Sequence, residues 1–207
     1  MLLEGSPILV HTLRKFLACP AVAEIIVPLR PEDLEWFGEQ VRQEAPPKPV
    51  RLVTGGEYRQ ESVRNGLAAA SPGLELVAVH DAVRPFVSVA QIEKVIAAAA
   101  ETGAAVLAIP PVDTIKQVDR TRIRATLPRD QVVLAQTPQV FRIDLLRRAY
   151  QQAEQDGFVA TDEAGLVERL DVEVSVVLGS DRNIKITKPS DMALARLFLR
   201  EEAEPRP

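Results

Sequence analysis

The sequence predicts an α/β fold built around a mostly parallel sheet. Short apolar runs alternate with longer segments in which apolar residues recur every three or four positions, a pattern typical of repeated strand–helix units. The chain has 207 residues, 46% of them hydrophobic and 26% charged, so it carries enough apolar mass for one core. It shows no internal repeat and no linker-like stretch. We therefore expect a single domain over residues 1–207.

The first half of the chain is predicted to alternate helices with strands. Ser6 is a suitable N-cap and Pro7 a suitable first helical residue, and the apolar stripe after them indicates a helix. By the same reasoning, helices are expected from Pro7 to before Pro20, over 31–44 and over 57–70, where helical periodicity comes with a start or stop signal. Short apolar runs that end at proline, glycine or polar residues predict strands at 25–27, 51–54 and 76–79. Pro28 is expected to end the first of these strands.

The second half continues the pattern with one interruption. Ser88 and Gln91 form a capping box that predicts a helix running to about Glu101. Further helices are expected at 143–155, 161–170 and 189–199, and further strands at 105–109, 174–178 and 183–187. Over residues 113–136 the period changes to two and a turn-like tip lies at 119–122, which predicts a protruding β arm.

Composition excludes several classes of function. The 25 Lys and Arg against 29 Asp and Glu leave a net charge of -4, the wrong sign for binding nucleic acid by charge alone. Cys19 is the sole cysteine, so neither a disulfide framework nor, with His11 and His80, a zinc cluster can form, whereas an oxygen-ligated Mg²⁺ remains compatible. No apolar run reaches the roughly 18 residues of a membrane span, and no signal peptide is evident. We expect a cytoplasmic protein with no membrane or nucleic-acid partner.

Candidate ligand-binding residues come directly after the predicted strands, because the carboxyl ends of parallel strands form the ligand site of open α/β sheets. Gly55 and Gly56 follow one strand and let the backbone approach a ligand, with the next helix start facing an anion. An ordinary strand-to-helix turn explains the same residues. Asp81 and Arg84 follow another strand, where they can hold Mg²⁺ and phosphate or form a salt-bridged turn. His80 is interpreted as a packed, hydrogen-bonded histidine.

Two further places have a functional and a plain interpretation. In residues 183–187, period two would project Lys185 beside Asn183 and Thr187, either into a site or from a solvated edge strand. Residues 136–139 and 161–163 read most simply as a turn and a helix N-terminus.

Six motifs in this order resemble one family along nearly the whole chain. They are GGEYRQES (55–62), VHDAVRP (79–85), VDTIK (112–116), QTPQVF (136–141), TDEAG (161–165) and NIKIT with a following proline and aspartate (183–191). The combination is similar to the 2-C-methyl-D-erythritol 4-phosphate cytidylyltransferases of the non-mevalonate isoprenoid pathway. The resemblance implies transfer of CMP from CTP to a methylerythritol phosphate, with release of pyrophosphate and with Mg²⁺, on a Rossmann-like nucleotidyltransferase fold in a homodimer. It also implies that the β arm crosses to the partner subunit.

The resemblance also implies roles for particular residues. The CTP cleft would include Gly55, Gly56, Arg59, Ser62, Asp81 and Ala82, and Asp81 would also bind the metal. The sugar-phosphate pocket would include Arg84, Thr114, Arg129, Thr137, Thr161 and Lys185, with Arg129 supplied by the partner subunit. The catalytic residues would be Lys185 and Asp81, with Lys185 neutralising charge near the attacked phosphate.

This sequence departs from the family pattern in two places. Family members open with a strand, a glycine-rich loop ending in arginine and a Pro-Lys-Gln segment, whereas residues from Met1 onward match the family pattern only after that segment. We therefore expect the triphosphate-binding arginine and lysine to be missing from this sequence, the recorded start to be wrong or truncated, and the chain as given to transfer CMP slowly. At Arg182, members often carry an acidic second metal ligand, a role that the neighbouring Asp181 could take over.

Two other functions share part of this pattern, and a third does not fit it. A related sugar- or pentitol-phosphate cytidylyltransferase would share the fold and the CTP side and differ in the acceptor pocket. A catalytically silent dimeric nucleotide-binding protein would match the absent glycine-rich loop. A pyridine-nucleotide dehydrogenase is rejected, because no G-x-G-x-x-G opens a helix in this chain.

Overall fold

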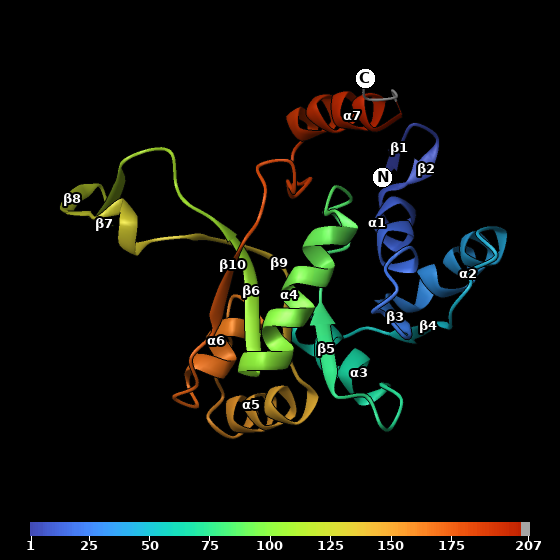
Figure 1. Cartoon of the computed structure of the whole chain (residues 1–207), viewed down its shortest axis with the longest axis horizontal. Helices are drawn as coiled ribbons and strands as arrows, with labels where there is room; N and C mark the ends of the chain where they lie inside the picture. The colour runs from blue at the N-terminus through green and yellow to red at the C-terminus, as the bar shows by residue number, and fades with distance from the viewer. Residues whose placement is uncertain (204–207) are drawn as a thin grey trace.

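A four-stranded sheet with the order β10–β6–β9–β5 forms the centre of the structure, a computed structural model that describes residues 1–203 (Figure 1). Its strands are β5 (Leu76–Val79), β6 (Ala104–Ile109), β9 (Leu134–Arg142) and β10 (Ser175–Leu178). The β9 strand runs antiparallel to both β5 and β6, and β10 runs parallel to β6, so three of the four strands share one direction. Together with the helices between the strands, this arrangement confirms the predicted α/β fold.

Helices cover both faces of this sheet. On one face, α4 (Val89–Thr102) buries Ile92, Val95 and Ala99 against Ala105 and Leu107. On the other face, α5 (Ile143–Gln155) and α6 (Glu163–Glu168) pack against the alternate residues of the same strand, Ala104 and Val106. Successive side chains of a strand point to opposite faces of the sheet, so β6 contributes to the cores on both faces.

A second parallel ladder joins β3 (Ile25–Leu29) to β4 (Val50–Thr54). Its core includes residues of α1 (Ile8–Leu17) and α2 (Leu34–Gln43), which comes after a 3-10 turn at Pro31–Asp33. A cavity of about 660 Å³ lies between β3 and β5 and is also lined by α1 and by α3 (Arg59–Ala68). This cavity opens onto the residues that come directly after β5.

The N-terminal strands lie beside the last described helix (Figure 1). The short strands β1 (Leu2–Leu3) and β2 (Ser6–Pro7) pair with each other, and α7 (Pro189–Ala203) lies next to them. Leu3, Ile8, Phe86, Ile186 and Ala195 form a small buried cluster there. None of the helices in the described part of the chain has the length and apolarity that crossing a bilayer requires.

The segment predicted as an arm contains an antiparallel hairpin of β7 (Ile115–Asp119) and β8 (Arg122–Leu127), with a 3-10 turn after it at Arg129–Gln131. The hairpin forms a sheet of its own. In Figure 1 it lies at the end of two extended connections, away from the other elements. The contact with a partner subunit stays a prediction.

Several predicted elements agree with the structure, and two details at prolines do not. The strand 76–79 and the helix 143–155 have the predicted bounds, and the Ser88–Gln91 capping box is present. Pro28 does not end its strand: it pairs with Val53 inside β3, where a residue without an N–H is tolerated because the other edge of β3 has no ladder partner. Ser6 is not the N-cap of α1, because its backbone pairs with Leu3 and the cap position falls on Pro7.

Two larger corrections concern the second half of the chain. Residues 136–139, read as a turn, lie in the long central strand β9, where Gln136, Thr137 and Gln139 are buried with hydrogen-bond partners. Residues 183–187, read as a strand, are not paired in any sheet. Asn183 is fully buried while Lys185 and Thr187 are exposed, so the three do not share one face.

Candidate functional site

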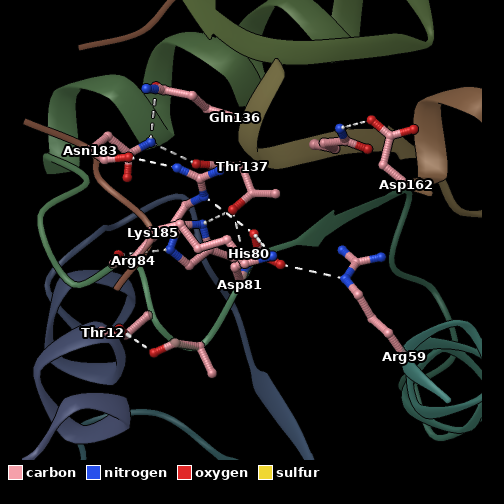
Figure 2. Close-up of polar contacts among 12 residues, drawn as sticks. Thr12, Arg59, His80, Asp81, Arg84, Gln136, Thr137, Asp162, Asn183 and Lys185 are labelled. Atoms are coloured by element: carbon pink, nitrogen blue, oxygen red, sulfur yellow. Dashed lines mark hydrogen bonds and ion pairs between the residues drawn. The ribbon is translucent and has the colours of Figure 1, made fainter. Parts of the chain in front are cut away.

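The candidate site surrounds Asp81, directly after β5, at the mouth of the cavity between β3 and β5. Arg59, Ser62, Asp81, Ala82 and Lys185 all line this cavity, although they come from three separate parts of the chain. Figure 2 shows Asp81 at the centre, with Arg59 approaching from α3 and with Arg84 and Lys185 on the opposite side. The fold therefore brings together residues of the CTP and sugar-phosphate sets that the resemblance implied.

Three cationic side chains converge on the Asp81 carboxylate. Its Oδ1 lies 3.4 Å from Arg59 Nε, and its Oδ2 lies 3.2 Å from both Arg84 Nε and Lys185 Nζ. Burial alone would raise the pKa of Asp81, but the nearby charges of Lys185 and Arg59 outweigh it and hold the pKa below its ordinary value. The four groups together carry a net positive charge, which suits an anionic ligand.

His80 and Thr137 hold the turn that carries Asp81. The backbone N–H of Asp81 donates to Thr137 Oγ1 at 3.0 Å, and this hydroxyl lies 3.0 Å from His80 Nδ1. The hydroxyl has one hydrogen, which it donates to the unprotonated Nδ1, so the imidazole carries its own hydrogen on Nε2 and donates it to Arg84 O at 3.0 Å. Desolvation lowers the pKa of His80 to about 4, so the ring is neutral near pH 7. The prediction of a packed, hydrogen-bonded histidine is confirmed.

Side chains from distant segments fix the same turn from two more sides. Thr12 Oγ1 on α1 donates to Ala82 O at 2.8 Å. Arg84 Nη1 donates to the backbone oxygen of Asn183 at 2.7 Å, and the amide of Asn183 donates to Thr137 O at 2.9 Å. The connection that carries Lys185 is thereby tied to β9 and to the Asp81 turn. Sequence reasoning missed Thr12 and the buried role of Asn183, because neither residue has a local pattern that indicates these contacts.

The Gly55–Gly56 loop is closed onto its own helix. Gly56 N–H donates to Ser62 Oγ at 3.0 Å, and Glu57 N–H donates to the Glu61 carboxylate at 2.9 Å. A Cβ added at Gly56 would overlap the side chain of Glu61, which explains the glycine. The two backbone N–H groups that could face an anion therefore face side chains of α3 in this structure.

Arg59 also pairs with Glu163, a partner that sequence reasoning did not predict. Its Nη1 and Nη2 lie 2.8 and 2.9 Å from the two carboxylate oxygens of Glu163, which is 1% exposed and also accepts a hydrogen bond from Tyr150 Oη. Asp162 caps α6 by accepting from Gly165 N–H, as the interpretation of a helix N-terminus requires. The spacing of 104 residues between Arg59 and Glu163 left no local signal.

Three predicted residues lie outside the Asp81 cluster. Thr114 is exposed next to β7, and Arg129 donates from Nη1 to Val112 O at 2.6 Å, so both lie at the base of the hairpin. Thr161 is exposed directly before the cap of α6. Among residues 1–203, no hydrogen bond or ion pair joins these three to Asp81.

The position at which family members often carry a second acidic metal ligand has other partners in this structure. Arg182 pairs with Glu201 and stacks over Phe198, and Asp181 beside it is exposed. Within the described residues, no group of three His, Cys, Asp or Glu could hold a metal ion.

The fold and the site define an α/β enzyme that handles phosphate groups, with one carboxylate and three cations beyond the end of a strand. Comparison with known proteins gives the particular kind. The sequence profile of 2-C-methyl-D-erythritol 4-phosphate cytidylyltransferase matches residues 1–201. The chain belongs to this family, whose members transfer CMP from CTP to 2-C-methyl-D-erythritol 4-phosphate in isoprenoid biosynthesis.

Individual relatives agree with this assignment. The cytidylyltransferase of this name from Solibacter usitatus is 64% identical over 98% of this chain and 85% of its own length. The cytidylyltransferase of the same name from Acidobacterium capsulatum is 50% identical over 97% of this chain and 86% of its own length. Among solved structures, 4-diphosphocytidyl-2C-methyl-D-erythritol synthase from Anaerococcus prevotii matches with a TM-score of 0.90 at 33% identity, over 96% of this chain and 88% of that one. The 2-C-methyl-D-erythritol 4-phosphate cytidylyltransferase from Thermus thermophilus matches with a TM-score of 0.81 at 37% identity, over 96% of this chain and 91% of that one.

Proposed function

We propose that this chain transfers CMP from CTP to 2-C-methyl-D-erythritol 4-phosphate at the Asp81 cluster and releases pyrophosphate. The observation that carries this placement is the convergence of Arg59, Arg84 and Lys185 on one carboxylate at the mouth of a cavity. Both substrates are phosphate esters, and fixed cations recognise them directly.

In the proposed reaction, a phosphate oxygen of the acceptor attacks the α-phosphorus of CTP. The new phosphorus–oxygen bond forms while the bond from the α-phosphorus to the bridging oxygen breaks, and the electron pair of that bond leaves with pyrophosphate. No covalent enzyme intermediate is needed, so positioning and charge neutralisation supply the acceleration. The side chain of Lys185 is 43% exposed and is available to contact a phosphate. The side chain of Arg84 is only 12% exposed and is held by its contact with Asp81.

Mg²⁺ belongs to the proposal, and the residues present fit it. Asp81 Oδ1 has only the 3.4 Å contact with Arg59, longer than either contact of Oδ2, so it is the oxygen most easily released to a metal ion. Mg²⁺ usually binds one or two carboxylates together with substrate phosphates, so a single protein carboxylate is sufficient. When bound, the ion supplies charge neutralisation on the triphosphate oxygens.

A homodimer completes the proposal. The hairpin is a two-stranded sheet of its own that exposes Val118 and Ile123 at 58% and 64%. Such a hairpin is at best marginally stable alone in water, so packing against a partner subunit would stabilise it. Arg129 and Thr114 lie at the base of this hairpin and make no contact with their own Asp81 cluster among the hydrogen bonds and ion pairs of residues 1–203. We expect the partner subunit's Arg129 to reach this cluster.

The proposed function is tested by measuring pyrophosphate release from CTP with and without 2-C-methyl-D-erythritol 4-phosphate. Release that requires this acceptor, is lost in Lys185→Ala and persists in Lys94→Ala supports the proposal, because Lys94 is an exposed cation on α4 away from the cluster. CTP binding without any release would indicate a silent nucleotide-binding protein. Release with another sugar or pentitol phosphate instead would indicate a related cytidylyltransferase.

A further inference from the structure

Arg59 lies between two carboxylates and divides its donors unequally. The fork of Nη1 and Nη2 faces Glu163, with both contacts below 3 Å at 2.8 and 2.9 Å. Only Nε faces Asp81, at 3.4 Å. A bidentate guanidinium–carboxylate pair is much stronger than a single long contact. The stronger interaction of Arg59 is therefore with the carboxylate that has no access to a ligand.

Glu163 is well suited to hold this fork. Its side chain is 1% exposed, and Tyr150 Oη donates to its Oε1 at 3.0 Å. Its backbone N–H donates to Gln139 Oε1 at 3.1 Å, which fixes the start of α6. An unpaired charge at such a buried position is costly, so Glu163 retains Arg59 strongly. Asp81, in contrast, has Arg84 and Lys185 as further cationic partners.

We propose that Glu163 is a positioning residue that keeps the Arg59 fork turned away from Asp81, so that Asp81 Oδ1 stays available to the metal and the nucleotide. This inference rests on the proposed function of the Asp81 cluster. Without the charge of Glu163, Asp81 is the carboxylate already in contact with Arg59, and the fork turns to it. A bidentate pair would then occupy the oxygen that a ligand needs.

The proposal predicts an interaction between two substitutions. Glu163→Gln removes the charge with little change of shape and should weaken CTP binding in the presence of Mg²⁺ by about tenfold. Arg59→Ala added to Glu163→Gln should restore part of this affinity, because the blocking pair can no longer form and the freed Asp81 Oδ1 outweighs the loss of one cation. If Glu163 only orients Arg59 as a ligand-binding group, the double variant should bind CTP no better than Glu163→Gln.

The affinities are measured by calorimetry with CTP and MgCl₂ for the wild type, both single variants and the double variant. Glu154→Gln is the matched control, because Glu154 pairs with Arg64 at 2.9 Å and also links α5 to α3. Its CTP affinity should stay within about twofold of the wild type, since a lost tether alone does not block Asp81. Thermal unfolding of each variant separates lost affinity from lost fold.

Two further measurements do not depend on the double variant. A crystal structure of ligand-free Glu163→Gln should show Arg59 Nη atoms at hydrogen-bond distance from Asp81, and a fork still directed at position 163 would overturn the proposal. Glu163→Asp keeps the charge, so its CTP affinity should stay within about threefold of the wild type, and a tenfold loss would count equally against the proposal. If the wild type transfers no CMP, the proposed function fails, whereas the orientation of Arg59 in the crystal structure still tests the role of Glu163.

Discussion

The neutral imidazole of His80 predicts that acidification will destabilise the fold. Desolvation lowers the pKa of His80 from 6.5 to about 4; the hydrogen bond to the Arg84 backbone and the charge of Asp81 work against this shift, and the charge of Arg84 adds to it. The unfolded chain therefore binds a proton at pH 5 to 6 that the folded chain does not bind. The resulting stability is fully present above pH 6.5 and is lost as the pH falls toward 4.

The size of this effect can be calculated from the two pKa values. For one group with pKa values of 6.5 unfolded and about 4 folded, linkage gives a loss of about 2 kcal/mol between about pH 7.5 and about pH 5. Glu24 and Glu44 also have lowered pKa values, so their contributions fall on acidification too. Glu24 and Glu44 are present in both the wild type and His80→Gln, so their contributions cancel when the two proteins are compared. The difference that remains is due to position 80, which does not titrate in the variant.

The assay is urea unfolding of the wild type and His80→Gln at several pH values between about 7.5 and 5. The variant is expected to be less stable at the upper end, since it loses the hydrogen bond that Thr137 donates to Nδ1. Its deficit should shrink by about 2 kcal/mol toward the lower end. A deficit that stays constant with pH would show that His80 titrates alike in the folded and unfolded states, and would refute the prediction that the buried ring stays neutral down to about pH 5.

Three other predictions concern the site and its loop. Asp81→Asn should lower CMP transfer at least about 100-fold in a steady-state assay, with thermal unfolding used to show that the variant is folded at the assay temperature, and an unchanged rate would remove Asp81 from the mechanism. Equal amounts of Arg129→Ala and Lys185→Ala subunits, unfolded and refolded together, should regain about one quarter of wild-type activity, because half of the dimers then hold one intact site of two. Activity no greater than that of either variant alone would place Arg129 outside the partner's site. Gly56→Ala should destabilise the chain by about 1–3 kcal/mol in denaturant unfolding, since the added Cβ overlaps Glu61, and a neutral result would show that the loop can move.

Local features of the sequence determined most of the element order. The strand at 76–79 and the helix at 143–155 were predictable from apolar runs and helical periodicity, and the Ser88–Gln91 capping box marks a helix start by short-range hydrogen bonds. The position of Asp81 directly after a predicted strand likewise indicated the end of the sheet at which the candidate site lies.

The tertiary structure alone decided which distant groups meet. The polar residues of β9 read as a turn because their hydrogen bonds come from other segments: Gln139 bonds to Asp162, and Thr137 to His80 and Asp81. The pairing of Arg59 with Glu163 has the same origin. Periodicity and capping act over a few residues, whereas a buried polar side chain is stabilised by whichever far segment the packing brings against it. The sequence therefore determined where β5 ends and Asp81 begins, and the packing of α3 and α6 determined how Arg59 is held beside Asp81.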